Sequence, residues 1–106
     1  HDRSSVFVFE ENGHVVGFTQ LYPAVCSVAM KPFYVLYDLY VVPEARAHGI
    51  GTALLRHAHT WARAKGAFRV DLETAHSNTT AQSIYEAVGY ELDTEFRKYS
   101  FDLASE

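Results

Sequence analysis

The chain has 106 residues, of which 48% are hydrophobic and 14% aromatic, and it carries a formal net charge of −4. This length predicts a single domain, residues 1–106, with one core, and the composition indicates a folded globule rather than a disordered chain. The acidic balance disfavours a general nucleic-acid-binding surface, which is normally basic.

Cysteine usage and hydropathy indicate where the protein works. Cys26 is the one cysteine, which excludes an internal disulfide framework and fits a reducing compartment. No apolar run is long enough to span a membrane, and there is no signal-peptide pattern. We therefore expect a cytoplasmic protein. Because the chain begins at His1 rather than Met, we also expect either that it has lost an N-terminal segment or that it retains residues from a tag or cleavage site.

The first part of the chain predicts β-structure. An apolar run at Val6–Phe9 is followed by the turn signal Glu11-Asn12-Gly13, which predicts a hairpin. The return strand is expected at Val15–Tyr22, where Pro23 ends it. The segment Ala24–Pro32 is open between a continuation of this strand and a turn.

The rest of the chain predicts alternating strands and helices. The long strand expected at Phe33–Val42 is nearly all apolar, so we expect it to be buried on both faces. The first helix is expected at Ile50–Lys65, where Gly66 ends it. A second helix at Asn78–Val88 and three further strands complete the pattern, the strands at Phe68–Thr74, Tyr90–Leu92 and Glu95–Leu103. This is a mixed α/β layout.

The junction between the long strand and the first helix is the most informative segment. It reads YDLYVVPEARAHGIGTALL and places Arg46, Gly49 and Gly51 between a buried strand and a helix start. Free N–H groups and the helix dipole favour an anion at such a start, and glycines let a ligand approach the backbone closely. The segment therefore predicts a phosphate-bearing ligand. The alternative is an ordinary strand–turn–helix connection whose glycines serve only the turn.

Two common phosphate-binding motifs do not fit this segment. A P-loop needs a lysine after its second glycine, but Thr52 follows Gly51. A dinucleotide fingerprint needs a third glycine, where Leu54 stands, and a paired βαβ unit. The residues present are R-x-x-G-x-G after an apolar strand. At this point the chain resembles the GNAT superfamily of acetyl-CoA-dependent N-acetyltransferases, whose signature is [QR]-x-x-G-x-[GA] in that context.

A second segment strengthens the resemblance. Residues 78–90 match the other hallmark of the family, N-x-x-A-x-x-x-Y-x-x-x-G-[FY], through Asn78, Ala81, Tyr85, Gly89 and Tyr90. One predicted strand separates this segment from the glycine turn, as the family requires. The local pattern agrees, because Ser77 or Asn78 can cap the helix and Gly89 stands where a left-handed C-cap is wanted. The resemblance covers the chain from about Val6 to its end and is nearest to the histone and polyamine acetyltransferases.

The resemblance implies a fold and an assembly. The fold class is α/β (α+β), with a mixed, mostly antiparallel central sheet, splayed strands and flanking helices. GNAT domains usually open with a strand and one or two helices that wall part of the acceptor site, and we expect these to be missing here. Either the chain is a fragment of a longer protein, or another chain completes the sheet. An exposed strand edge at Val6–Phe9 would be free to pair, so we expect a homodimer formed by strand pairing.

The resemblance implies acetyl-CoA as cosubstrate and indicates what would hold it. Main-chain groups of the long strand would bond the pantetheine arm as an added strand would, and the turn amides would bind the diphosphate. The helix of the second motif would hold the arm from the other side. The residues assigned to the coenzyme are Leu39, Val41, Arg46, Ala47, His48, Gly49, Ile50, Gly51, Thr52, Asn78 and Ala81.

Two residues are assigned to catalysis. By resemblance, Tyr85 holds the general-acid position near the coenzyme sulfur; the alternative is a core aromatic on a helix face. Asp38 interrupts an otherwise uncharged strand, so we expect a bulge or splay that turns its carboxylate to a cleft and the acceptor amine. The alternatives are a rim position or a structural ion pair. The base is open between Asp38, Glu73 and a water chain.

We therefore predict an enzyme that moves an acetyl group from acetyl-CoA to a primary amine by direct attack in a ternary complex. The expected acceptor is a small-molecule or lysine-type amine. The alternative is a non-catalytic acyl-CoA-binding or structural module with the same fold. Six histidines do not form a metal pattern: His57 and His59 lie two apart on a helix, and the rest are scattered without partners at ligand spacing. We expect most of them to be solvated and no metal to be bound.

Overall fold

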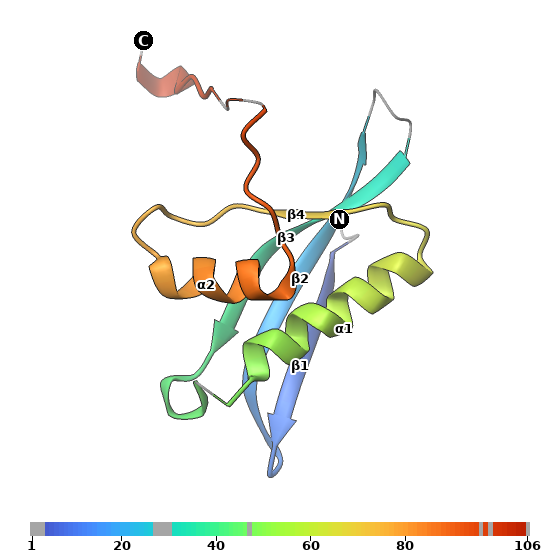
Figure 1. Ribbon diagram of the computed structural model, residues 1–106, viewed down its shortest axis with the longest axis vertical. Helices are drawn as coiled ribbons and strands as arrows, with labels where there is room; N and C mark the ends of the chain where they lie inside the picture. Colours follow the sequence, from blue (N-terminus) through green and yellow to red (C-terminus); the bar gives the residue numbers. More distant parts are fainter. Residues whose placement is uncertain (1–3, 27–30, 47, 96, 98, 106) are drawn as a thin grey trace.

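A four-stranded sheet organises the chain (Figure 1). The computed structural model describes residues 4–26, 31–46, 48–95, 97 and 99–105. The strands stand in the order β1-β2-β3-β4. The first three pair antiparallel, and β3 and β4 pair in parallel. Their bounds are Ser5–Glu11 for β1, His14–Cys26 for β2, Lys31–Val41 for β3 and Val70–Leu72 for β4.

The predicted hairpin between β1 and β2 is confirmed. Asn12 and Gly13 both have positive φ, 52° and 81°, as the tight turn requires. The prediction that Pro23 ends the return strand is wrong, because β2 runs through it to Cys26. The described pairs with β1 end at Leu21, so Pro23 lies where β2 is an edge on that side. A proline is tolerated at such an edge.

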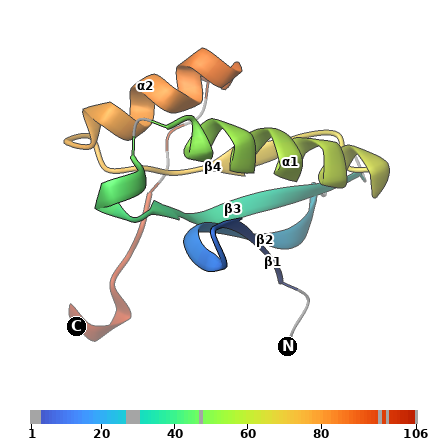
Figure 2. The ribbon, with the colours of Figure 1, turned by 90° about the horizontal axis from the view of Figure 1, so that it is seen from below.

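Two helices cover one side of the sheet (Figure 2). They are α1 (Ile50–Ala64) and α2 (Thr79–Val88), both within one residue of their predicted bounds. Each is followed by a glycine with positive φ, Gly66 at 88° and Gly89 at 119°. These left-handed positions stop the helices where the sequence predicts. A short 3₁₀ turn, η1 (Pro43–Ala45), links β3 to α1.

The core lies between the helices and the sheet. Its larger cluster joins Leu21 and Leu36 of the sheet to Leu55 and Ala58 of α1 and Tyr85 of α2. A smaller cluster of Ala45, Ile50 and Leu54 lies under the start of α1. These buried side chains fix both helices on the sheet by removing their apolar faces from water.

The prediction that the long strand is buried on both faces is wrong. Tyr37 and Tyr40 of β3 are 62% and 43% exposed, while Leu36 is buried. The physical reason is that both helices lie on the same side, so the described part of the chain leaves the opposite face of β3 open (Figure 2). The apolar run cannot reveal this, because tyrosines fit a half-exposed strand as well as a buried one.

The predicted closing strands are also wrong in the described residues. No described residue from 90 to 105 lies in a strand, and the segment ends in a 3₁₀ turn, η2 (Leu103–Ser105). This segment leaves the body of the molecule in Figure 1. Asp93 and Asp102 accept backbone N–H bonds from residues two positions on, at 2.9 Å each. Such local bonds compete with strand pairing. The strand expected at Phe68–Thr74 is present but shorter, as β4.

Candidate functional site

A splay between β3 and β4 opens the sheet beside the first helix. The two strands pair over three positions, from Tyr34↔Val70 to Leu36↔Leu72. Beyond Leu36, β3 continues to Val41 while the described chain after Leu72 leaves it. The β2–β3 register also shifts here, since Gln20 pairs with Asp38 and Leu21 with Leu36, which leaves Tyr37 as an extra, bulged residue. The outer edge of residues 37–41 is therefore free of β4.

The start of α1 is open to a ligand. Gly49 is the N-cap residue, with φ of 77° in the left-handed region, and no side chain caps the helix. The first backbone bond of the helix joins Ala53 N to Gly49 O, so the N–H groups of Ile50, Gly51 and Thr52 have no helical partner. A Cβ built on Gly49 would meet no atom within 4 Å. This is the geometry of an anion site at a helix start.

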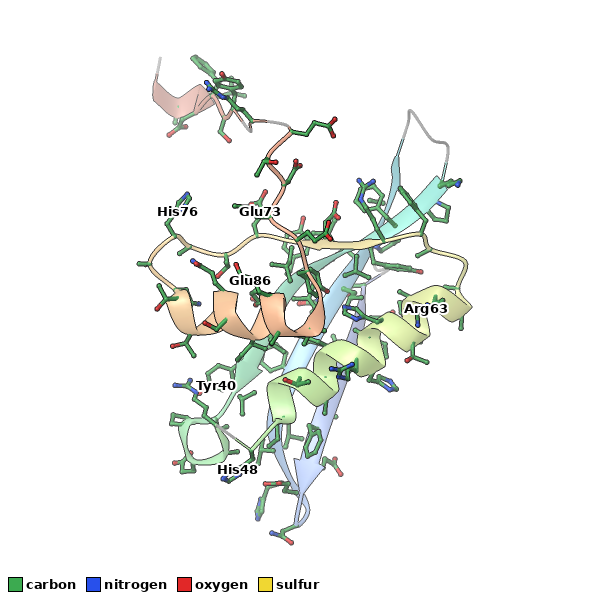
Figure 3. The ribbon with its side chains drawn as sticks, in the orientation of Figure 1. Tyr40, His48, Arg63, Glu73, His76 and Glu86 are labelled. Atoms are coloured by element: carbon green, nitrogen blue, oxygen red, sulfur yellow. The ribbon has the colours of Figure 1, made fainter. Side chains whose placement is uncertain are left out.

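Arg46 and His48 both belong to the turn between β3 and α1, and Figure 3 shows where His48 lies. The Nε of Arg46 donates a 2.8 Å hydrogen bond to the Val41 carbonyl, and its guanidinium lies 5.6 Å from the centre of the Tyr40 ring. The arginine therefore joins the end of β3 to the turn and places a positive charge there. His48 is exposed. The predicted coenzyme residue Ala47 lies outside the described residues.

Leu39 and Val41 have different surroundings from one another. The Leu39 side chain packs against both core clusters, and that of Val41 against the smaller one. Their outer strand edge faces the splay, but the Val41 carbonyl is already bonded to Arg46. A ligand that added to this edge would therefore find fewer free acceptors at Val41 than at Leu39.

Asn78 and Ala81 have a structural role at the start of α2. The Asn78 Oδ1 accepts a hydrogen bond from the Ala81 N–H at 3.2 Å, which makes Asn78 the N-cap. Ala81 is half-buried and packs on the larger core cluster. Gln82 Nε2 donates to the carbonyls of Ala75 and His76, which holds the loop before the helix in place. The structure thus decides between the two predicted caps in favour of Asn78.

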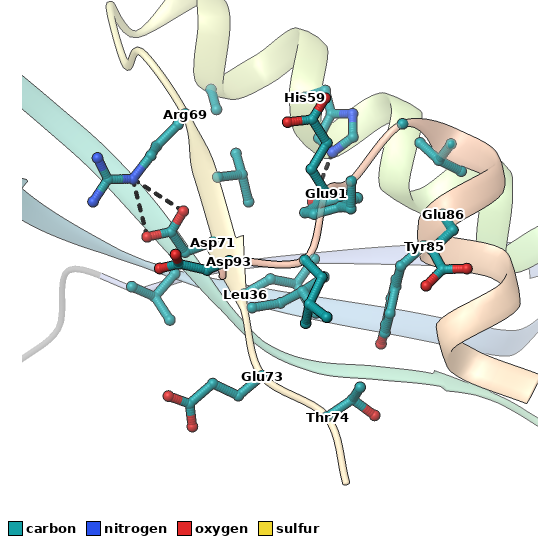
Figure 4. A pocket seen from close by; sticks show the side chains of 18 of the residues that line it. Leu36, His59, Arg69, Asp71, Glu73, Thr74, Tyr85, Glu86, Glu91 and Asp93 are labelled. Carbon is teal, nitrogen blue, oxygen red and sulfur yellow. Dashed lines mark hydrogen bonds and ion pairs between the residues drawn. The ribbon is translucent and has the colours of Figure 1, made fainter. Parts of the chain in front are cut away.

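Tyr85 is both a core residue and a cleft residue. It is only 9% exposed and belongs to the larger core cluster, as the structural alternative proposed. It also lines a cleft of ≈ 1570 Å³ between β4, α2 and residues 90–95, into which its ring points (Figure 4). No described residue bonds its hydroxyl, and no described side chain leaves a buried polar atom unpaired, so the hydroxyl reaches solvent. Burial raises the pKa of this phenol above its usual value of 10.0.

The structure separates the two carboxylates that were candidate bases. Leu39 packs toward the helices, so its strand neighbour Asp38 points to the open face, on the side of Gln20. Asp38 is exposed and does not line the cleft that contains Tyr85. Its carbonyl accepts a 2.6 Å bond from the Thr19 hydroxyl. Glu73 does line the cleft with Tyr85 (Figure 4).

A pair that the sequence did not indicate lies beside Tyr85. His59 Nε2 and the Tyr90 hydroxyl share a hydrogen bond of 2.7 Å. Burial, with Arg63 and Arg56 adding to it, lowers the pKa of His59 below 6.5. His59 is therefore an exception to the prediction that most of the histidines are solvated. His59 stands three residues before the buried Ala62 and four residues after the buried Leu55. This helical spacing puts it on the buried face of α1 and could have predicted its burial from the sequence.

The sequence predicts neither a metal-binding cluster nor a membrane-spanning helix. Among the described residues, no three His, Cys, Asp or Glu side chains gather where they could hold a metal ion. No helix in the described ranges is both long enough and apolar enough to cross a membrane.

Comparison with known proteins identifies the family. Residues 1–90 match the Acetyltransferase (GNAT) family. The chain belongs to the GNAT family of acetyltransferases. It is 48% identical over 101 residues to an uncharacterized N-acetyltransferase, YhfO, of Bacillus subtilis (strain 168), covering 95% of this chain and 68% of that protein. This membership places the chain among the acyltransferase enzymes.

More distant GNAT relatives are longer than this chain. An aminoglycoside N(6')-acetyltransferase type 1 of Klebsiella aerogenes is 34% identical over 83 residues, which cover 74% of this chain and 53% of the relative. An uncharacterized N-acetyltransferase, MJ1207, of Methanocaldococcus jannaschii is 31% identical over 91 residues, which cover 85% of this chain and 40% of that protein. The chain thus spans about half the length of these two relatives.

Solved structures confirm the GNAT fold. A probable acetyltransferase superposes with a TM-score of 0.85 at 35% identity, over 98% of this chain and 70% of that one. An integron cassette protein from the mobile metagenome of V. cholerae gives a TM-score of 0.86 at 28% identity, and the match covers 96% of this chain and 63% of that one. The mixed, mostly antiparallel sheet with flanking helices is therefore the predicted fold class.

Proposed function

We propose that the protein transfers an acetyl group from acetyl-CoA to a primary amine by direct attack in a ternary complex. The observation that carries this proposal is the open glycine turn at the start of α1, next to a β3 edge that β4 leaves free. Family membership supports the same reading. The diphosphate would bind the N–H groups of residues 50–52, with Arg46 supplying positive charge and His48 adding to it when protonated.

The pantetheine arm would follow the free edge of β3 toward Tyr85. Backbone groups at Leu39 would bond it as an added strand does. Asn78 and Ala81, at the start of α2, would flank the arm on its other side. This path leads from the turn at one end of α1 to the buried phenol of α2, whose hydroxyl is free of described partners.

The chemistry assigned to Tyr85 is proton donation to sulfur. The neutral amine nitrogen attacks the thioester carbonyl carbon, the C–N bond forms and the C–S bond breaks. The leaving thiolate takes the Tyr85 hydroxyl proton, and the amine loses one proton to a base. Because burial raises the pKa of Tyr85, the phenol is fully protonated at neutral pH and ready to donate.

The base is Asp38, Glu73 or a water chain. Asp38 would meet an amine that arrives from the open face of the sheet, whereas Glu73 would meet one in the cleft that it shares with Tyr85. The pH–rate profiles of Asp38→Asn and Glu73→Gln distinguish these two carboxylates. If only Asp38→Asn loses the acidic limb of the profile, Asp38 is the base. If only Glu73→Gln loses it, Glu73 is the base.

The acceptor class rests on relatives. Relatives of this chain include proteins named aminoglycoside N(6')-acetyltransferase and N-alpha-acetyltransferase 40. We therefore propose a primary amine on a small molecule or a peptide as acceptor. Thiol release from acetyl-CoA, measured across polyamines, amino acids, aminoglycosides and lysine peptides, identifies it.

The decisive experiment replaces Gly51. A Cβ there would meet only Leu39 Cδ2, at 3.9 Å, so the backbone at Gly51 accepts a side chain without a clash at its Cβ. In Gly51→Leu the rest of the side chain would fill space that the proposed ligand needs, and a circular dichroism spectrum checks that the variant is folded. Gly49 is less suited, because its positive φ would strain any replacement. We expect calorimetry to show at least about a 100-fold loss of acetyl-CoA affinity if close backbone approach is required.

The matched control is Ala53→Leu, which adds the same side chain to an exposed position of the same helix. It should bind acetyl-CoA normally. Retained binding by a folded Gly51→Leu protein would refute the site. Normal binding by the wild type without thiol release for any amine would favour the alternative, a non-catalytic acyl-CoA-binding module.

A further inference from the structure

The His59–Tyr90 pair joins the two helices that carry the proposed site. His59 belongs to α1, whose first turn would hold the diphosphate. Tyr90 follows α2 directly, after its glycine cap. The 2.7 Å bond between the His59 Nε2 and the Tyr90 hydroxyl is therefore a polar link between α1 and the end of α2. The two rings also lie against each other, with 5.2 Å between their centres.

Tyr90 is in turn fixed to Tyr85. The Tyr90 N–H donates a 3.0 Å bond to the Tyr85 carbonyl, and the Gly89 N–H donates to the same carbonyl at 3.1 Å. This is how a left-handed glycine cap closes a helix. The two tyrosine rings lie 5.8 Å apart at an angle of 60°. Tyr90 therefore contacts Tyr85 both through the backbone and through its ring.

We propose that His59 and Tyr90 are positioning residues that hold the Tyr85 hydroxyl at a fixed place relative to the start of α1. This proposal rests on the proposed function, in which those two places serve opposite ends of acetyl-CoA. Neither residue contacts the reacting atoms in this scheme. Their hydrogen bond fixes the separation between the diphosphate end of the site and the acid at its sulfur end.

Other features of the pair fit this role. Tyr90 is kept protonated, because burial, with Tyr85 and Asp71 adding to it, raises its pKa far above 10.0. Arg56 and Arg63 on α1 oppose protonation of His59. A neutral imidazole facing a neutral phenol gives a hydrogen bond with no charge to desolvate, so the link is stable in a partly buried place.

The test uses variants that break the hydrogen bond from either side. Tyr90→Phe removes only the hydroxyl, and His59→Leu replaces the imidazole by an apolar side chain. His59→Gln restores a polar group that can reach the same hydroxyl. His57→Leu is the matched control, because His57 is exposed on the same helix and its ring lies on Phe7 rather than on Tyr90.

The first readout is NMR of the ligand-free protein, and the second is the steady-state kinetics of acetyl transfer. In tyrosine-selective carbon-13 NMR, the Tyr85 ring signals should shift or broaden in Tyr90→Phe and His59→Leu but remain in His59→Gln and His57→Leu. With the acceptor found by the amine screen, the first two variants should lose about 10-fold or more in kcat while the KM for acetyl-CoA stays within about twofold.

The outcomes separate this inference from the proposed function. Unchanged Tyr85 signals in folded Tyr90→Phe would overturn the inference. Equal activity of His59→Leu and His59→Gln would also overturn it. That result would mean that the side chain at position 59 only fills space, because leucine fills the space but cannot form the hydrogen bond. If the NMR shifts appear but the wild type transfers no acetyl group, the positioning link stands and the proposed function fails.

Discussion

Tyr85 shows how one side chain can serve the core and a site. Its ring packs with Leu36 and Leu55, while its hydroxyl has no described partner. A structural tyrosine of this burial would normally bond its hydroxyl. This hydroxyl instead reaches solvent at the edge of a cleft, so it is open to a ligand, as the proposed function requires.

Tyr85→Phe separates these two roles. The ring is kept, so we expect the free energy of unfolding to change by less than about 0.5 kcal/mol. If the hydroxyl donates the proton to sulfur, kcat should fall by about 100-fold or more while acetyl-CoA affinity is unchanged. Steady-state kinetics and calorimetry measure both quantities. Tyr34→Phe, which removes the same atom from a ring that packs at a tilt against Trp61, is the control. Equal kcat in the two variants would exclude Tyr85 as the acid.

His59 should make stability depend on pH. Its pKa lies below 6.5 in the folded protein and near 6.5 in the unfolded chain. As pH falls through this window, the unfolded chain takes up a proton before the folded protein does. The free energy of unfolding therefore decreases as pH falls below about 6.5. Urea unfolding at several pH values should show a shallower decrease for His59→Gln, which cannot titrate. Parallel curves for the two proteins would mean that His59 is not the titrating group.

The elements that local chemistry determines were predicted well. Both helices follow from apolar spacing and from the glycines that end them, and the hairpin follows from Asn12-Gly13. The failures concern partners distant in the chain. Tyr37 and Tyr40 are exposed because no described element covers their face, and Leu92, 83% exposed, lies in a segment whose described residues form no strand. Local patterns carry no information on whether such a partner is present.

The same limit applies to the candidate site. The glycine turn was predicted because all its residues are adjacent. His59 and Tyr90 lie 31 positions apart, so their hydrogen bond depends on how α1 and α2 pack. Glu73 was a candidate from sequence, but only the structure places it in the cleft with Tyr85. Sequence spacing predicts sites within one turn, and packing decides those between elements.

Gly17 shows how closely α1 packs on the sheet. A Cβ on this residue would lie 3.1 Å from the Tyr40 carbonyl oxygen and 3.2 Å from side-chain atoms of Ile50 and Leu54. Gly17→Ala should therefore push the first turn of α1 away and destabilise the protein by about 1–3 kcal/mol. Urea unfolding measures this loss, and the exposed Val15→Ala on the same strand should cost under about 0.5 kcal/mol. An equal, small effect of both would show that the helix start is free to move.

At the scale of the whole molecule, β1 is an edge strand of the sheet. Its outer side has no strand partner among the described residues, and Val6 and Val8 are 54% and 51% exposed. An edge with apolar side chains is prone to pair with another edge, so the strand-paired homodimer stays our prediction. Two copies that add β1 to β1 would form one continuous sheet and bring these valines beside those of the second copy.

Val8→Lys tests this assembly. A lysine on an exposed edge position opposes strand pairing by placing like charges close together in the two copies. Multi-angle light scattering should give a dimer for the wild type and a monomer for Val8→Lys. Val15→Lys, an equally exposed position on β2, adds the same charge away from the edge strand and should stay dimeric. A monomeric wild type at working concentration would contradict the prediction. A dimer that persists in Val8→Lys would move the interface to another surface. One apolar alternative is the open face bearing Tyr22 and Tyr37, which are both exposed and whose rings pack edge to face at 4.8 Å.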